Sequence, residues 1–265
     1  MSLLAIETTG AKASAALLSE SGELRIETSD ETMNHLQHLI PMIDSLLSKC
    51  GITIDDVSVI AISEGPGSFT GIRIGMATAK GLAQVIGAPV VGVPTLESFV
   101  YHRADYRGLV CPIFDAKRSQ VYAGVYFCDG RGGYRRLMED GAYDLPVYLE
   151  GLRTACSSAL AERGGLPEEG PLTVTLFGDG IAPYGEQIAK AVEDWNFNSD
   201  SLSTKGDICL KTAEEEQRYQ SAASVAMLGR SLFDQGKAKS LFDLHPVYLR
   251  KAEAERKLEE AQKKK

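Results

Sequence analysis

The chain has 265 residues, of which 44% are hydrophobic and 24% charged, a composition typical of a globular protein with a sizeable core. Its net charge of −8 makes it a poor non-specific binder of nucleic acid, so any contact with RNA must use a local patch or another subunit. The N-terminal residues lack the basic region of a signal peptide, no apolar run could span a bilayer, and the five cysteines form no CxxC pair. These features predict a cytoplasmic protein with no membrane contact and with reduced thiols.

The first fifty residues predict three strands and a helix. The strands are apolar, short and separated by turn residues, and we place them at Leu3–Glu7, Ala13–Leu18 and Leu24–Thr28. Apolar residues at steps of three and four then predict a helix from Leu36 to Cys50. Pro41 interrupts this pattern, so the helix either kinks or starts there.

A βαβ unit follows. It consists of a buried strand over Val57–Ser63, a glycine loop, a helix from about Thr70 to Ile86, and a strand over Pro89–Val93. Strands joined through a helix in this way are parallel, so the predicted sheet is at least partly parallel.

The second half of the chain repeats this order at an offset of about 108 residues. Glu7 and Asp115 each end an apolar strand, and Thr173–Phe177 with its glycine loop and following helix repeats the βαβ start. Two copies of β-β-β-α-β-α indicate an ancestral duplication. They predict the actin-like (ASKHA) α/β fold, with two domains that each hold a mixed sheet flanked by helices, and a cleft between them.

We place the domains at residues 1–105 and 106–250, followed by a charged C-terminal tail at 251–265. Residues 160–171 and 196–217 are rich in Gly, Glu, Ser and Asp and are predicted to form long loops. The segment from Arg250 to the end has seven basic and four acidic residues, a net of +3. It is either a solvated helix or an arm that contacts RNA.

In actin-like proteins, nucleotide phosphates lie between two hairpin turns whose small residues let backbone N–H groups approach the anion. The first turn here, which starts at Glu7, keeps small residues, but the second contains Lys117 and Arg118 and no glycine. Glu7 also stands where an aspartate usually helps to hold a metal-bound water, and an error of about 1 Å is costly for that chemistry. A stand-alone ATPase or kinase is therefore a disfavoured alternative.

The glycine loop contains Gly65, Gly67 and Gly71, which allow backbone conformations closed to other residues. Thr70 is the predicted helix N-cap, and free N–H groups at the helix start could bind an anion. The loop is neither a GxSxG nucleophile elbow nor a Walker loop. The candidate nucleotide or anion residues are Glu7, Thr8, Thr9, Gly65, Gly67 and Ser68.

Two histidines, His35 and His38, stand three residues apart on the first predicted helix. This spacing puts both on one face, where they could hold a metal with a third ligand or form a metal-free surface pair. The chain has neither HExxH nor HxxxH, and we predict no metal site and no catalytic centre.

The helix after the glycine loop is nearly apolar all round. Its only charges are Arg73 and Lys80, and Ile74, Thr78, Gly81 and Val85 make a second apolar face opposite the first. Such a helix must be covered on both sides, and small residues would let another backbone approach. The preceding helix carries only Asp44 and Lys49, so the two helices form either a partner-docking surface or an internal layer.

Arg73 opposes the helix dipole, so we expect either an acidic group of a partner or a group of its own domain beside it. The candidate partner-binding residues are His35, Leu39, Met42, Ile43, Leu46, Arg73, Ile74, Gly75, Thr78, Ala79 and Leu82.

The segments LLAIETT, SEGPGSFTGIRIGMATAKGLA, DAKRSQVYAGVY and PVYLR together resemble the bacterial TsaB (YeaZ) family, over essentially the whole chain to about Arg250. The resemblance implies a non-catalytic scaffold subunit of the tRNA threonylcarbamoyladenosine machinery. Its partner would be the paralogue TsaD, which carries the metal and modifies the adenosine beside the anticodon. The ATPase TsaE would join the assembly, and tRNA would be contacted only indirectly.

The same resemblance implies that the two N-terminal helices pack with their TsaD counterparts as a four-helix bundle, and that homodimers form through a similar surface. It implies no cofactor required by this chain, with ATP or ADP as a candidate ligand at a partner interface. Glu7 and Lys117 replace a commoner Asp and a frequent Arg of the family, which weakens the expectation of nucleotide binding. The family's older label, glycoprotease, suggests a metallopeptidase, which the missing HxxxH disfavours.

Overall fold

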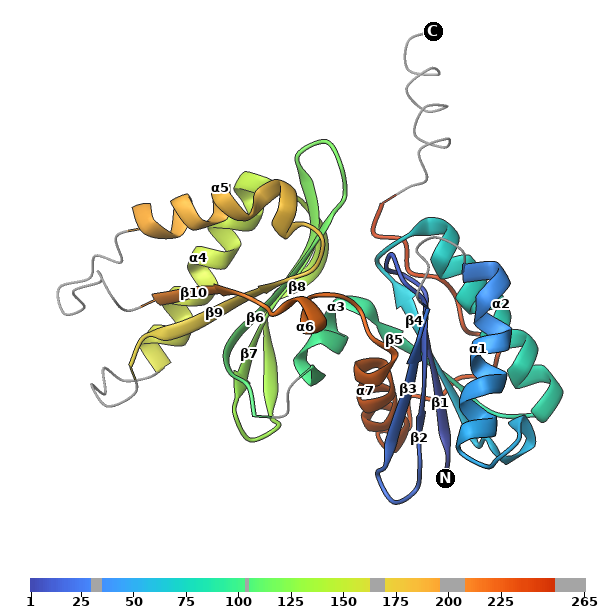
Figure 1. The fold of residues 1–265 in the computed structure, drawn as a ribbon. Coiled ribbons are helices and arrows are strands. Elements are labelled where there is room, and N and C mark those ends of the chain that lie inside the picture. The colour runs from blue at the N-terminus through green and yellow to red at the C-terminus, as the bar shows by residue number, and fades with distance from the viewer. Residues whose placement is uncertain (30–34, 103–104, 163–169, 196–207, 251–265) are drawn as a thin grey trace, which may run out of the picture. The chain divides into compact units, whose positions relative to one another are not determined.

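The computed structural model describes residues 1–29, 35–102, 105–162, 170–195 and 208–250 (Figure 1). Their contacts divide the chain into two compact units, and the second comprises Leu96–Leu228. The first comprises Met1–Thr95 together with the residues from Gly229 onward. This division differs from the sequence-based boundaries, because residues 229–250 return to the first unit, where the Leu244 side chain is fully buried in the core.

The first unit is built on a five-stranded mixed sheet with the order β3-β2-β1-β4-β5. β1 is antiparallel to β2 and parallel to β4, and every residue of this central strand is buried. The strands are β1 (Leu3–Glu7), β2 (Ser14–Leu18), β3 (Leu24–Thr28), β4 (Val59–Gly65) and β5 (Val90–Pro94).

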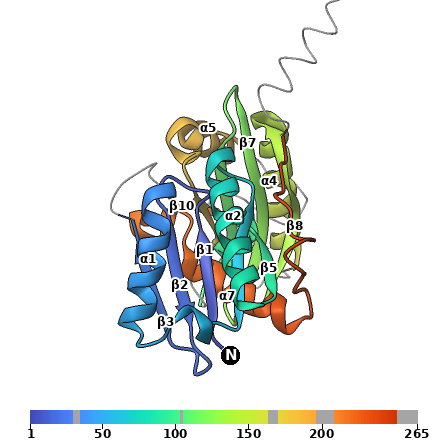
Figure 2. The same ribbon diagram turned by 90° about the vertical axis from the view of Figure 1, so that its right-hand side faces the viewer.

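Two long helices, α1 (His35–Lys49) and α2 (Phe69–Ile86), cover one face of this sheet (Figure 2). Ile60 and Ile62 of β4 point toward them, in one core cluster with Met76 and Ala79 of α2. Strand residues alternate between faces, so Ala61 points to the opposite side, where Gly229 of α7 (Ala222–Asp234) approaches it. The short helices η1 (Ile54–Asp56) and α3 (Thr95–Ser98) lie in connections.

The second unit repeats this plan with the sheet order β8-β7-β6-β9-β10. β6 is antiparallel to β7 and parallel to β9, as β1 is to β2 and β4. Its elements are β6 (Arg107–Asp115), β7 (Gln120–Asp129), β8 (Tyr134–Asp144), α4 (Leu145–Glu162), β9 (Leu172–Phe177), α5 (Ile181–Asp194), β10 (Ile208–Thr212), and the short η2 (Phe99–Tyr101) and α6 (Glu215–Arg218). The predicted duplicated actin-like α/β fold, with a mixed sheet and flanking helices in each copy, is confirmed.

Several local predictions are corrected. Helix α1 begins before Pro41 and continues through it, which rules out a start at Pro41, one of the two alternatives. The N-cap of α2 is Ser68 and not Thr70, since the Ser68 hydroxyl accepts a hydrogen bond of 3.2 Å from the Gly71 N–H. Part of the predicted loop 196–217 is ordered structure, because β10 adds to the sheet beside β9. Residues 196–207 of that segment and the tail 251–265 lie outside the described residues.

None of the described helices is long and apolar enough to cross a membrane. The five cysteines are free thiols, and burial raises the pKa of Cys128 and Cys156 to about 12.

Candidate protein-docking site

The glycine loop between β4 and α2 packs directly against the turn that follows β1. The Ser68 N–H donates to the Thr9 carbonyl at 2.8 Å, and the Thr8 hydroxyl donates to the Gly71 carbonyl at 2.8 Å. A Cβ atom on Gly67 would lie 2.5 Å from the Thr9 Cβ, and one on Gly71 would collide with the Thr8 carbonyl. The structure thus brings Thr8, Thr9, Gly67 and Ser68 together, but the turn itself occupies the space beside Gly67 and Gly71.

Gly65 has a different neighbour. Its φ of +115° is closed to other residues, and a Cβ there would lie 2.5 Å from the Val247 carbonyl oxygen. Residues 239–250, which we call the strap, run back along the first unit at this point. The Val247 N–H donates to the Glu64 carbonyl at 2.7 Å, and Lys239 forms an isolated antiparallel β-bridge with Val90.

Glu7 is fully buried at the end of β1. Its carboxylate accepts hydrogen bonds from the Thr9 N–H and the Ser63 hydroxyl, and burial raises its pKa. These bonds tie the turn to β4, so the acid has a structural task in holding the two loops together. Nucleotide binding at this position stays a prediction.

The corresponding turn of the second unit is built differently. Lys117, Arg118 and Ser119 all have φ near +60°, a left-handed conformation that is strained for residues with a side chain. The Lys117 ammonium lies 2.6 Å from the Asp115 carboxylate, which also accepts from the Tyr184 hydroxyl at 3.1 Å. Burial alone would raise the pKa of Asp115, but these hydrogen bonds outweigh it and lower that pKa. Lys117 is thus already paired with an acid.

Most of the candidate partner-binding residues point inward. Leu39, Met42, Ile43 and Leu46 belong to the buried core of the first unit, and so does Ala79. This corrects the expected docking face, because these side chains pack on the protein's own sheet.

Gly75 also serves an internal contact. A Cβ there would collide with the Thr8 hydroxyl and lie 2.9 Å from the Ile62 Cδ1, so the glycine lets α2 approach β1 and β4. Of the other candidates, Ile74, Thr78 and Leu82 are half-buried, and the side chain of His35 lies outside the described part of the chain.

The outward surface is formed by other residues of the same two helices. Val85 of α2 is 78% exposed, and Ala77 and Gly81, eight and four positions before it, are exposed on the same side of α2; on α1, Ile40 is 50% exposed. We call Ala77, Gly81 and Val85 the outer stripe. The sequence placed Gly81 and Val85 on the second apolar face of the helix, and the 3.6-residue period could also have identified Ala77, four positions earlier.

Arg73 has its partners within the first unit. Its guanidinium carbon lies 3.9 Å from the ring centre of Phe69, and its Nε donates to the Tyr248 hydroxyl at 2.9 Å. The two rings lie 4.8 Å apart. Sequence reasoning missed Tyr248, because 175 residues separate it from Arg73.

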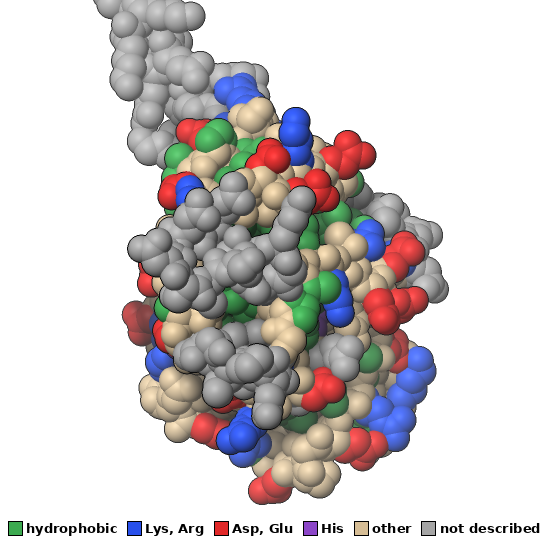
Figure 3. Space-filling model, turned by 90° about the vertical axis from the view of Figure 1, so that its left-hand side faces the viewer, with side chains coloured by type: hydrophobic (Ala, Val, Ile, Leu, Met, Phe, Trp, Pro, Cys, Tyr) green, Lys and Arg blue, Asp and Glu red, His purple; other side chains and the backbone are tan. Residues whose placement is uncertain are grey.

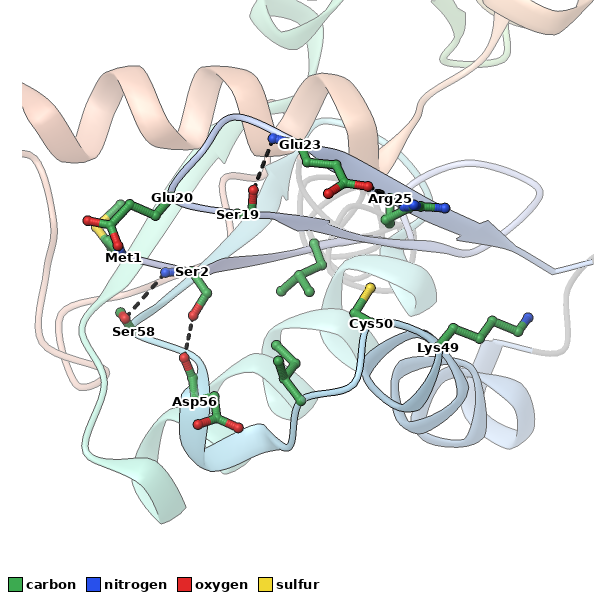
Figure 4. Close-up of a pocket in the computed structure, with 12 residues that line it drawn as sticks. Met1, Ser2, Ser19, Glu20, Glu23, Arg25, Lys49, Cys50, Asp56 and Ser58 are labelled. Carbon is green, nitrogen blue, oxygen red and sulfur yellow. Dashed lines mark hydrogen bonds and ion pairs between the residues drawn. The ribbon is translucent and has the colours of Figure 1, made fainter.

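A separate hollow of about 460 Å³ lies at the other end of β1 (Figure 4). Its rim is charged, but Arg25 pairs with Glu23 at 2.7 Å and Lys49 pairs with Glu27 at 2.6 Å. None of the predicted site residues lines it. Across the described ranges, no cluster of three or more His, Cys, Asp or Glu side chains could hold a metal ion.

Comparison with known proteins places this geometry in a family. The model of the family described as TsaD, tRNA N6-adenosine threonylcarbamoyltransferase, matches residues 29–258. The tRNA threonylcarbamoyladenosine biosynthesis protein TsaB of Bacillus subtilis is 32% identical over 99% of this chain and all of its own length. The TsaB of Escherichia coli is 34% identical over 50% of this chain and 58% of its own length.

A solved structure named YeaZ from Pseudomonas aeruginosa superposes with a TM-score of 0.65 at 25% identity, covering 93% of this chain and 99% of that one. The full-length match to the Bacillus protein decides the assignment, and this chain belongs to the TsaB (YeaZ) family of tRNA threonylcarbamoyladenosine biosynthesis proteins.

Proposed function

We propose that this chain is a non-catalytic, cytoplasmic scaffold subunit of the tRNA threonylcarbamoyladenosine system, and that it acts by docking TsaD through the outer stripe. The match to the TsaD family model supports a paralogous pair that shares one fold. In the proposal TsaE is a further partner, tRNA is contacted through other subunits, and the chain needs no cofactor of its own.

The observation that carries the proposal is that most of the exposed large apolar side chains belong to three segments of the first unit, namely α1, α2 and the strap. Ten large hydrophobic side chains of the described residues are exposed, and six of them lie on α1, α2 or the strap: Ile40, Phe69, Val85, Phe242, Val247 and Tyr248. Such a concentration marks an interaction surface better than isolated apolar residues do.

The second copy of the fold provides an internal comparison. Helices α1 and α2 carry four Asp, Glu, Lys or Arg residues in total, whereas their counterparts α4 and α5 carry seven. On the face drawn in Figure 3, acidic and basic side chains of the described residues are interspersed. Depletion of charge is therefore specific to the first pair of helices, as expected for the core of an interface.

Gly81 adds a second reason. A Cβ on this exposed residue would meet nothing within 4 Å, so no contact among the described residues requires a glycine there. Glycine in a helix interior costs about 1 kcal/mol relative to alanine. Close approach of a partner's backbone explains why this cost is tolerated.

The proposal is tested by reconstituting tRNA modification with TsaD, TsaE and ATP, with and without this chain. In the variant Val85→Glu, a charge enters the outer stripe, and we expect loss of both TsaD co-elution and tRNA modification. The matched control is Val147→Glu on α4, which is also an exposed helical valine, at 55% exposure, and should change neither. TsaD binding that survives Val85→Glu, or ATP turnover by this chain alone, would contradict the proposal.

A further inference from the structure

Two cationic residues of α2 lie beside the small residues of the outer stripe. Arg73 and Lys80 are seven positions apart, which corresponds to about 10 Å along a helix and to nearly the same side of it. Ala77 lies between them, and Gly81 follows Lys80. Two positive charges therefore lie on the same side of α2 as its exposed small residues.

No ion pair joins either cation to a carboxylate within the described residues. Arg73 bonds to Tyr248 through Nε and lies against Phe69, so its two Nη groups have no hydrogen-bond partner in the described ranges. The first turn of α2 contains no acidic residue that would offset the positive helix end. Neither cation is therefore paired with an acid of the described residues, although acidic residues outnumber basic ones in this chain, whose net charge is −8.

We infer that the partner's contact surface is a helix that presents two carboxylates about seven positions apart, one to Arg73 and one to Lys80. Small residues of that helix would lie on Ala77 and Gly81. This inference rests on the proposed function and specifies the chemistry of the docked partner. Phe69 and Tyr248 hold the Arg73 guanidinium in place, so little side-chain freedom remains to be lost when its Nη groups bind a carboxylate.

The same two cations should weaken the pairing of this surface with a second copy of the chain, the homodimer that the family resemblance implies. In a twofold pairing of two antiparallel α2 helices centred on Ala77, Arg73 of one copy lies beside Gly81 and Lys80 of the other. Like charges would then face one another, whereas an acidic partner helix would be attracted. Repulsion in the wrong pair and attraction in the right pair together produce specificity.

The test compares the double variant Arg73→Gln and Lys80→Gln with the wild type in two equilibria, TsaD binding by calorimetry and self-association by sedimentation, each at low and high salt. We expect TsaD binding to weaken roughly tenfold or more and to lose most of its salt dependence. Self-association should tighten, because the repulsion is removed. The two equilibria move in opposite directions only if the charges discriminate between partners.

A matched control removes two cations from the corresponding helices of the second unit, Arg153→Gln on α4 and Lys190→Gln on α5, and should leave both equilibria unchanged. If the double variant bound TsaD as tightly as the wild type does, this inference would be wrong and the proposed function would stand. Failure of the wild type to bind TsaD at all would overturn the proposed function itself. Equal weakening of both equilibria would also overturn the inference, since the cations would then not discriminate.

Discussion

The replacement Gly81→Ala should stabilise the free protein and weaken its complex with TsaD. Gly81 lies in the interior of the 18-residue helix α2, is exposed, and has open space where a Cβ would stand. Alanine removes the backbone entropy cost of glycine, so the free energy of unfolding should rise by about 0.5–1 kcal/mol. For a unit of this size, the melting temperature should rise by about 2–4 °C.

In the complex the added methyl group would stand where the partner's backbone approaches. Overpacking of a close contact costs about 1–3 kcal/mol, which corresponds to a roughly 5- to 150-fold weaker affinity. Calorimetric titration of TsaD measures this loss, and urea unfolding of the free chain measures the gain in stability. Both measurements use the same variant, so a general defect in folding cannot imitate the result.

Gly75→Ala is the matched control, since this glycine lies in the same helix and faces inward. Its Cβ would collide with the Thr8 hydroxyl, so the variant should lose stability. If Gly81→Ala were also destabilised, the outer stripe would have an internal contact. If Gly81→Ala were more stable but bound TsaD as tightly as the wild type, no backbone would approach there, and the reason given for this glycine would be wrong.

Two further predictions concern the fold. Gly71→Ala would drive a methyl group into the Thr8 carbonyl and should reduce the free energy of unfolding by about 3 kcal/mol or more. Urea denaturation measures this loss, and unchanged stability would contradict the packing of the glycine loop on the turn. Burial raises the pKa of Asp140 to about 6, so the folded protein holds this proton more tightly than the unfolded chain. The contribution of Asp140 to the free energy of unfolding should therefore fall as the pH rises from about 4 to about 6 and level off above, by up to about 3 kcal/mol. Asp140→Asn should remove this part of the pH dependence in melting curves, and an unchanged profile would refute the assignment.

The duplicated fold could be predicted because its signals are local. Each copy has alternating apolar strands, a glycine after the fourth strand and a helical period, and the offset of 108 residues aligns Glu7 with Asp115 at the ends of β1 and β6. Strand β10 was missed because Ile208–Thr212 is a short edge strand in a polar segment, and only its pairing with β9 makes it a strand.

The outward face of α2 could not be chosen from the sequence. Both faces of that helix are apolar, so periodicity cannot distinguish Gly75 from Gly81. Thr8 packs closely against Gly75, whereas a Cβ on Gly81 would meet no described atom within 4 Å. The partner of Arg73 was likewise beyond local reasoning. Tyr248 reaches it only because the strap returns along β4, an arrangement that depends on the tertiary fold.

The return of the strap has a consequence for the part of the chain that follows it. Tyr248 contacts Phe69 and Arg73, so a segment joined after residue 250 is tethered within a few residues of the outer stripe. Tethering raises the local concentration of such a segment to the millimolar range for a short linker, whatever its own affinity.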